Sequence, residues 1–175
     1  MVDAKTNTDL WVLPLEGDRK PMPLLRTAFN DGSLESPGQF SPDGRWIAYL
    51  SNESGRNEVY VRAFSPAVVA GSPEAGSKWL ISRGASASGR IKWRGDGKEL
   101  TYVASDGKVM AVEVTTTSEF SFGEPKSLFS LPPGVLRMDQ TADGQRWLVA
   151  VPVALSTPTP FTVVLNWQTG LTRTK

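Results

Sequence analysis

Short apolar runs separated by turn residues recur along the whole chain. The clearest run, residues 46–50, reads Trp-Ile-Ala-Tyr-Leu and is apolar on both alternating faces, a pattern typical of a strand that is buried on both sides. It follows Pro42, Asp43 and Gly44, which predict a tight turn because proline presets φ, aspartate caps the turn and glycine accepts a positive φ. Residues 38–41 and 46–51 are therefore predicted to be two strands joined by that turn.

The combination of an Asp-Gly turn and a following apolar strand recurs, so the chain is predicted to be a repeat protein. Asp-Gly turns begin at positions 43, 96 and 143, about 50 residues apart, and a four-stranded unit repeating at this interval indicates a β-propeller blade. Residues 147–151 are apolar throughout, like 46–50, and are predicted to be buried between neighbouring blades. An immunoglobulin-type sandwich would instead show one-sided alternation and no internal repeat. Strands are predicted at 9–13, 23–27, 38–41, 46–51, 58–64, 78–82, 90–93, 99–104, 108–114, 125–129, 136–139, 147–151 and 161–167.

Charge and composition exclude several classes of function. The 175 residues carry 19 Lys and Arg against 18 Asp and Glu, with no long run of one sign, so neither nucleic acid nor an anionic membrane surface is expected as a partner. The longest apolar runs are far too short for a membrane span, and the first residues lack the apolar region of a signal peptide. Because cysteine and histidine are absent, disulfides, thiolate or imidazole metal sites, and Ser-His-Asp or Cys-His catalysis are excluded within this chain.

For each motif that suggests a catalytic or binding site, a structural role is the favoured interpretation. Asp43, Asp96 and Asp143 could bind calcium, but calcium needs about six to eight oxygens and each turn offers one carboxylate, so turn capping is predicted. Residues 84–89 narrowly miss the G-x-S-x-G pattern of serine hydrolases. Residues 71–78 match a phosphate-binding loop only loosely, and a strand is predicted after them where such a loop requires a helix. No catalytic residue, metal site or cofactor is predicted. The tryptophans in strand patterns are predicted to be core residues rather than ligand-stacking platforms: Trp11, Trp46, Trp147 and Trp167.

Residues 41–49, followed by 58–61, resemble the TolB-type β-propeller repeat, which is also found in the propellers of prolyl-oligopeptidase-like peptidases. The match is looser at 89–114 and partial at 136–151, where the turns keep Asp-Gly but lose the proline. Over residues 8–171 the chain also resembles the C-terminal propeller segment of bacterial eukaryotic-like serine/threonine kinases and of some winged-helix regulators, although the kinase motifs themselves are absent. The resemblance implies the sensor part of a signalling protein. It implies an extracytoplasmic, periplasmic location if the parent is a membrane kinase, and otherwise a cytoplasmic one.

Propellers of the TolB type usually have six blades, so the chain is predicted to be all-β and to form about half of such a ring. Residues 1–175 then make one propeller fragment with two full blades, 38–82 and 89–129, and two partial blades, 8–27 and 136–168. A half-ring leaves two apolar blade faces without neighbours, and such faces normally mark interfaces. A homodimer is therefore expected, in which the N-terminal strands of one copy complete the last blade of the other.

The binding surface is predicted from position alone. In propellers the loops between blades and the turn between the middle strands share one face, and the first strand of each blade lines the central channel. The segment 83–94 is basic and could meet an anionic ligand or an acidic peptide, or form a solvated rim. The candidate binding residues are Asp31, Glu53, Arg56, Asn57, Arg83, Arg90 and Lys92, with the loop 152–160 beside them.

Three functions are compatible with these patterns. The favoured one is a non-catalytic module that binds a protein or small-molecule ligand. The alternative is an accessory domain that gates a peptidase or hydrolase encoded elsewhere. A carboxylate-based enzyme is the third, and it requires a converging acidic pair that the sequence does not locate.

Overall fold

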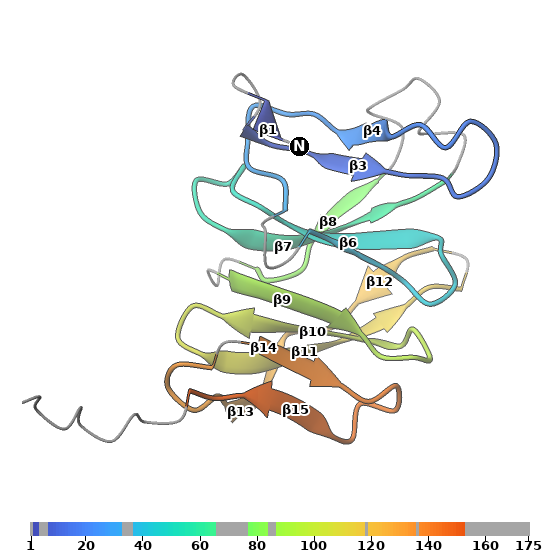
Figure 1. Ribbon diagram of the computed structural model, residues 1–175. Helices are drawn as coiled ribbons and strands as arrows, with labels where there is room; N and C mark the ends of the chain where they lie inside the picture. The colour runs from blue at the N-terminus through green and yellow to red at the C-terminus, as the bar shows by residue number, and fades with distance from the viewer. Residues whose placement is uncertain are drawn as a thin grey trace, which may run out of the picture.

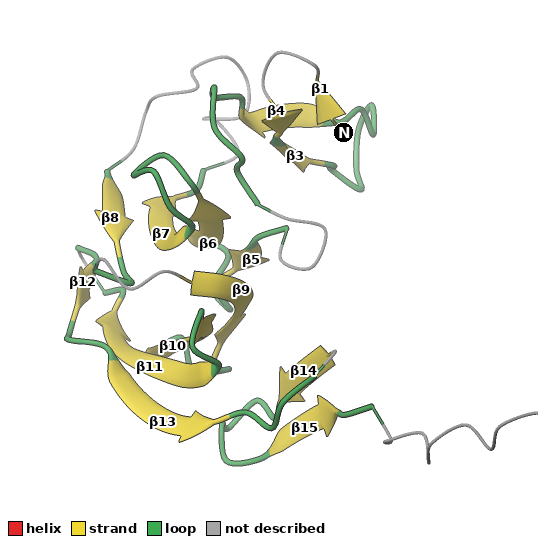
Figure 2. Ribbon diagram, turned by 90° about the vertical axis from the view of Figure 1, so that its left-hand side faces the viewer, coloured by secondary structure: helices red, strands yellow, loops and turns green. Residues whose placement is uncertain are grey.

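The computed structural model describes residues 2–3, 7–32, 37–65, 77–83, 87–117, 119–135 and 137–152, which are all-β. They form a partial β-propeller: antiparallel sheets stacked face to face along a curved path, with β5 (Gln39–Phe40), β9 (Ala87–Trp93) and β14 (Arg137–Gln140) along the inner edge (Figures 1 and 2). The described part of the chain contains no helix of the length and apolarity that a membrane crossing requires.

Two complete blades occupy the middle of the molecule. The first blade pairs β5, β6 (Trp46–Ser51), β7 (Glu58–Ala63) and β8 (Lys78–Leu80) in that order. The second blade pairs β9, β10 (Glu99–Ala104) and β11 (Lys108–Thr115), and its outer edge is divided between β12 (Ser121–Phe122) and β13 (Lys126–Ser130), which both pair with β11. The strand at β12 was not predicted, because two residues carry too little pattern to be recognised.

A two-stranded hairpin stands at each end of the stack. The N-terminal hairpin consists of β3 (Leu10–Val12) and β4 (Met22–Leu25), and the C-terminal hairpin consists of β14 and β15 (Trp147–Ala150). A small additional pair joins β1 (Val2–Asp3) to β2 (Asn7–Thr8). The predicted strand 161–167, and with it most of the partial blade 136–168, lies outside the described residues, as does Trp167.

The largest apolar cluster lies between the two complete blades. Trp46, Val59 and Val61 of the first blade pack there against Leu100, Tyr102 and Val112 of the second. A second cluster joins the other face of the first blade, through Tyr49 and Tyr60, to Leu10 and Leu25 of the N-terminal hairpin. Consequently β6 is buried on both faces, as its sequence predicts.

The three Asp-Gly turns are structural, as predicted. In each, the glycine has a φ near +70° and its N–H donates to the carbonyl three residues earlier: Ser41, Arg94 and Thr141, each at 2.8 Å. The aspartate carboxylate in turn accepts the N–H two residues later, from Arg45, Lys98 and Gln145 at 3.1, 3.0 and 3.0 Å. In the part of the chain that the structure describes, no three acidic side chains gather where they could hold a metal.

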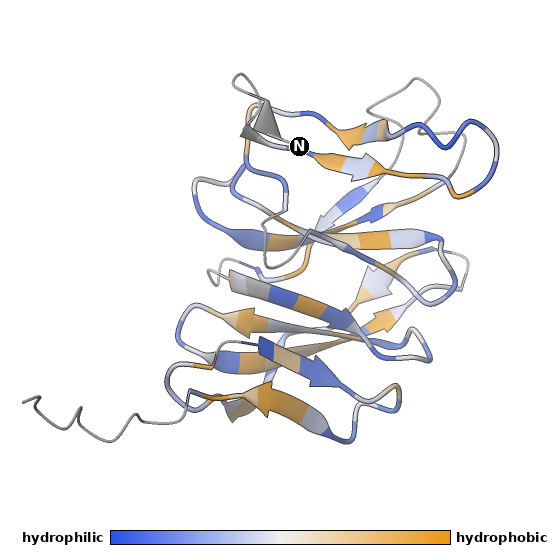
Figure 3. Ribbon diagram, in the orientation of Figure 1, coloured by the Kyte–Doolittle hydropathy of each residue, from blue (hydrophilic) through white to orange (hydrophobic). Residues whose placement is uncertain are grey.

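The prediction that residues 147–151 are buried on both faces is wrong for the described structure. Leu148 is 77% exposed and Val151 44% exposed, although Figure 3 shows β15 to be mostly apolar. One face of β15 lies against the second blade, where Trp147 meets Phe129 edge to face, and no described sheet covers the other. Trp46 is a core residue as predicted, whereas Trp11 and Trp147 are only half-buried.

Candidate functional site

Loops from successive sheets meet along one rim of the stack, here called the loop rim. It comprises the described parts of segments 26–32, 52–57, 81–87, 105–107 and 131–135. Hydrogen bonds join these segments: Asn30 N–H donates to Asn52 Oδ1 (2.8 Å), Ala87 N–H to Asn57 O (2.8 Å) and Leu131 N–H to Gly107 O (2.9 Å). The Asp-Gly turns lie at the opposite ends of the strands, as predicted, since β6, β10 and β15 each run from such a turn toward the loop rim.

Four of the predicted binding residues form ion pairs. Glu53 accepts Lys78 Nζ at 2.6 Å, and the Lys78 ammonium also lies 5.2 Å from the ring centre of Tyr60. Arg56 pairs with the buried Glu58 at 3.1 Å, and Arg83 pairs with Glu124 while stacking over Phe122. Lys92 lies along the inner strand β9 and pairs with Asp139 of the C-terminal hairpin at 3.2 Å. Asn57 is exposed on the loop rim, and its binding role stays a prediction.

Asp31 lies inside the molecule rather than on its surface. It is 1% exposed, its carboxylate accepts the Thr27 hydroxyl at 2.6 Å, and its backbone bridges to Ser51 of β6. Burial raises the pKa of Asp31, the hydroxyls of Thr27 and Ser51 lower it in part, and the charges of Glu53 and Asp9 raise it further. The carboxylate of Asp31 is therefore enclosed rather than presented on the loop rim. Its contacts instead hold the segment 27–32 against β6.

Arg90 lines a hollow in the loop rim, here called the Arg90 hollow. Its volume is about 390 Å³, within the range of small-molecule sites. The hollow has three walls: the start of β9, the β10–β11 turn, and the connection 131–135 that leads from the second blade to the C-terminal hairpin. The lining residues are Ser88, Arg90, Val103, Ala104, Ser105, Asp106, Gly107, Leu131, Pro132, Pro133, Gly134 and Val135.

The backbone at Arg90 is strained. Its φ is +56°, a left-handed conformation that costs a residue with a side chain on the order of 1 kcal/mol or more. The β9–β10 register shifts beside it, between the pairs of Thr101 and Val103, which is the mark of a β-bulge. The Arg90 guanidinium donates from Nη2 to Val135 O at 3.0 Å. Bulges and strained residues concentrate at functional sites because they change the direction in which a side chain points. Here the side chain concerned is that of Arg90.

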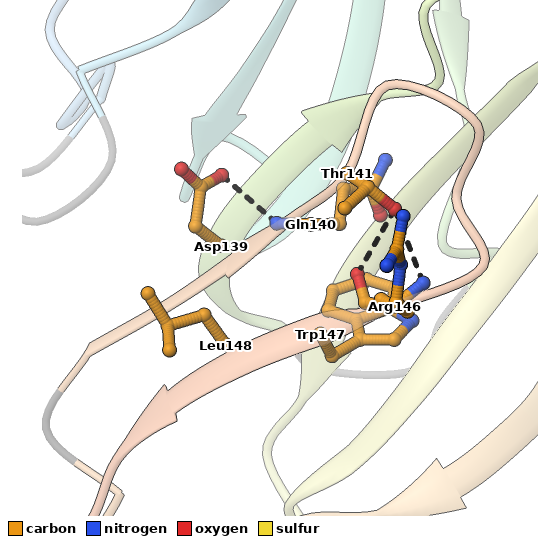
Figure 4. Close-up of a pocket in the computed structure, with 6 residues that line it drawn as sticks. All are labelled: Asp139, Gln140, Thr141, Arg146, Trp147 and Leu148. Atoms are coloured by element: carbon orange, nitrogen blue, oxygen red, sulfur yellow. Dashed lines mark hydrogen bonds between the residues drawn. The ribbon is translucent and has the colours of Figure 1, made fainter.

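A second, larger hollow of about 540 Å³ lies beside the C-terminal hairpin (Figure 4). Asp139 and Leu148 pair across the hairpin on one face, and Gln140 and Trp147 pair on the other. Thr141 and Arg146 complete the lining at the Asp-Gly turn. Gln140 accepts the Thr101 hydroxyl at 3.1 Å, and its amide nitrogen is buried without a hydrogen-bond partner among the described residues.

Sequence reasoning found one wall of the Arg90 hollow and missed the others. Arg90 was a candidate because the first strand of a blade was expected to line the channel. Ser88 and the connection 131–135 were not candidates, although Pro132, Pro133 and Gly134 are a turn signal that places a loop at this point. The positive φ of Arg90 has no sequence signal, since it arises from the register shift against β10.

No protein-family model matches the chain, and no curated protein matches it. Among solved structures, TolB from Acinetobacter baumannii is similar over 83% of this chain, with 17% sequence identity and a TM-score of 0.44. The chain spans 43% of the length of that protein.

Proposed function

We propose that this chain is a non-catalytic binding module whose loop rim takes a polar peptide segment of a partner protein in the Arg90 hollow. The observation that carries the proposal is the strained arginine at a bulge of the inner strand, with its side chain lining a hollow of about 390 Å³. The position of the module in a signalling protein, and its attachment to a kinase, stay predictions from the sequence resemblance.

The chemistry of the lining supports a peptide as the ligand. The hollow offers donors and acceptors together, from the Arg90 guanidinium, the Ser88 and Ser105 hydroxyls and the Asp106 carboxylate, which pairs with Lys108 Nζ at 2.7 Å. A peptide backbone presents both kinds of group, so it suits a mixed lining better than a simple anion does. Pro132 and Pro133 provide a rigid apolar border on one side.

A matched pair of variants tests the proposal. Arg83 lies on the loop rim and Arg90 lines the hollow beside it, and both have a positive φ, +45° and +56°. Glycine accepts this conformation, so Arg83→Gly and Arg90→Gly each remove a guanidinium without straining the fold. Only Arg90 lines the hollow, so only Arg90→Gly is expected to weaken binding.

The probe is a set of peptides selected from a random library displayed on phage against the unmodified protein, then synthesised with a fluorescent label. Anisotropy titrations are expected to show Arg90→Gly weakening these peptides at least about tenfold, the value of one charge-assisted hydrogen bond, with Arg83→Gly unchanged. Thermal unfolding of both variants verifies that they are folded. A selection that yields no binding peptide, or peptides that bind Arg90→Gly normally, would overturn the proposal.

A further inference from the structure

The two end hairpins are each half of a blade, and they are opposite halves. A complete blade in this chain has four strands, whereas each hairpin has two among the described residues. In the C-terminal hairpin β14 lies inside, against β9, and β15 lies toward the outer strand β13, because Trp147 meets Phe129. β14 and β15 are therefore the first and second strands of a blade, and the outer edge of β15 faces the place of a third.

The N-terminal hairpin has the reverse arrangement. Leu10, Trp11 and Val12 of β3 line a groove of about 140 Å³ together with Phe40 of β5 and Ile47, so β3 is the strand nearer the inner edge. β4 leads into segment 26–32 on the loop rim, and β3 accordingly runs away from that rim, antiparallel to a strand such as β6 or β15. β3 and β4 thus correspond to the third and fourth strands of a blade, and no first or second strand of that blade pairs with them in the part of the chain that the structure describes.

We propose that a second copy of this chain completes both ends, so that β15 of one copy pairs with β3 of the other. The composite blade would read β14, β15, β3 and β4, with the last two strands from the partner, so that the partner's β3 takes the third position rather than the predicted strand 161–167 of the same chain. The same contact repeats at the other end of each chain, which closes a two-fold ring. The occupant is a second copy because the two ends of this chain supply complementary halves.

The exposed apolar side chains agree with this pairing. Leu148 projects from the face of β15 that turns away from the second blade, and it is 77% exposed. On a composite blade that face continues into the face of β3 that bears Leu10 and Val12, so Leu148 would enter the groove beside Phe40, itself 50% exposed. On the opposite face of the composite blade, Trp11 and Leu13 of the partner would lie beside Trp147. These three side chains would then cover the outer part of the second blade.

Charges at the Asp-Gly end of the composite blade also complement each other. Arg146 immediately precedes β15, and Glu16 lies in the turn that follows β3. Antiparallel pairing brings these two segments to the same end of the blade. Neither the Arg146 guanidinium nor the Glu16 carboxylate has an ion-pair partner among the residues that the structure describes.

The first test is the mass of the full chain in solution. Size-exclusion chromatography with light scattering at micromolar concentration is expected to give twice the 19.0 kDa chain mass. Leu148→Lys is expected to weaken the dimer about 100-fold, because a charged ammonium would have to be desolvated in an apolar groove. Phe29→Lys, which changes an exposed apolar residue on the loop rim, is expected to leave the dimer intact. A monomeric chain, or a dimer that Leu148→Lys does not weaken, would overturn the proposal.

Crosslinking tests the pairing itself. The chain has no cysteine, so an introduced pair reports a single contact. Ala150 and Val12 would share one face of the composite blade, whereas Trp11 lies on the other. A short bis-maleimide is expected to join two chains in Val12→Cys/Ala150→Cys and not in Trp11→Cys/Ala150→Cys. Within one chain β3 and β15 lie at opposite ends of the stack (Figure 1), so crosslinking inside a single copy, or equal crosslinking of both variants, contradicts the proposal.

Discussion

Strands β6 and β15 have nearly the same sequence pattern and very different surroundings. Each follows an Asp-Gly turn and begins with tryptophan and an apolar run. Every residue of β6 is buried, because the second blade covers one face and the N-terminal hairpin covers the other. In β15 half-buried and exposed positions alternate, because among the described residues only the second blade lies against it.

The edges of the two strands differ in the same way. β6 is hydrogen-bonded on both sides, to β5 and β7, whereas β15 pairs only with β14 among the described residues. An unpaired edge and an uncovered apolar face are unfavourable in water, and natural proteins normally protect both. The sequence of β15 therefore suits surroundings that β6 has and that β15 lacks among the described residues.

Two leucines provide the largest contrast. Leu100→Ala removes a side chain that is fully enclosed in the cluster between the blades, and is expected to cost about 3 kcal/mol of unfolding free energy. Leu148→Ala removes the same atoms from an exposed position, and in the monomer is expected to cost less than about 0.5 kcal/mol. Urea denaturation at a protein concentration at which light scattering gives the monomer mass measures both.

The dependence of the unfolding free energy on urea concentration is the control for Leu100→Ala and Leu148→Ala. An unchanged dependence on urea in both variants verifies that midpoint shifts report stability. Equal costs for the two leucines would show that β15 is covered within the monomer, and the comparison with β6 would then fail.

The sequence predicts local features well because they depend on neighbouring residues. The Asp-Gly turns and the strands after them follow from Pro42, Asp43 and Gly44 and from the alternation in 46–51. The burial of 147–151 could not be predicted, because it depends on whether another sheet lies against β15. The sequence pattern is the same in either case.

The candidate site was predictable only in outline. The alternation of strands and turns places Arg90 near the loop rim, but the ion pairs there depend on register. Glu53 reaches Lys78 across the width of the first blade, a contact that requires knowing how β8 pairs with β7. Asp31 illustrates the same limit, since its polar sequence context suggests a surface loop while its contacts with Thr27 and Ser51 enclose it.

A glycine controls how the C-terminal hairpin is held against the second blade. Gly95 N–H donates to Ala142 O at 2.7 Å, and a Cβ at Gly95 would lie 2.9 Å from that same oxygen. Gly95→Ala is therefore expected to push the hairpin away and to lower its local stability by about 1–2 kcal/mol. Hydrogen exchange by mass spectrometry should show faster exchange in β14 and β15, with the first blade unchanged.

Gly123→Ala is the matched control for this prediction. Its Cβ would meet nothing closer than Glu113 O at 3.9 Å, which is an ordinary contact. If exchange in β14 and β15 stays at the unmodified rate in Gly95→Ala, the hairpin is not positioned by this contact.

The smallest expected difference is between the Asp-Gly turn inside the second blade and that of the C-terminal hairpin. The Arg94 guanidinium, bonded at 2.8 and 3.0 Å, together with the Lys98 N–H, lowers the pKa of Asp96 to about 2. The pKa of Asp143 is also lowered, by the Thr141 hydroxyl and the Gln145 N–H, which are neutral donors. Replacement by asparagine keeps an acceptor for the turn and removes the charge, so it isolates the ion pair with Arg94.

Asp96→Asn is expected to cost about 0.5–1 kcal/mol at pH 7, a value reduced by solvent because the pair is partly exposed. A carboxylate with a lowered pKa in the folded state stabilises the fold above its unfolded pKa, near 3.8, and this contribution is lost as pH falls toward about 2. Urea denaturation between pH 7 and pH 3 should therefore show the gap between Asp96→Asn and the unmodified chain narrowing as pH falls. Asp143→Asn should have the smaller effect at pH 7, since no cation among the described residues pairs with Asp143. A gap that is independent of pH would mean that Asp96 acts only as a turn cap, and that the two turns do not differ in this respect.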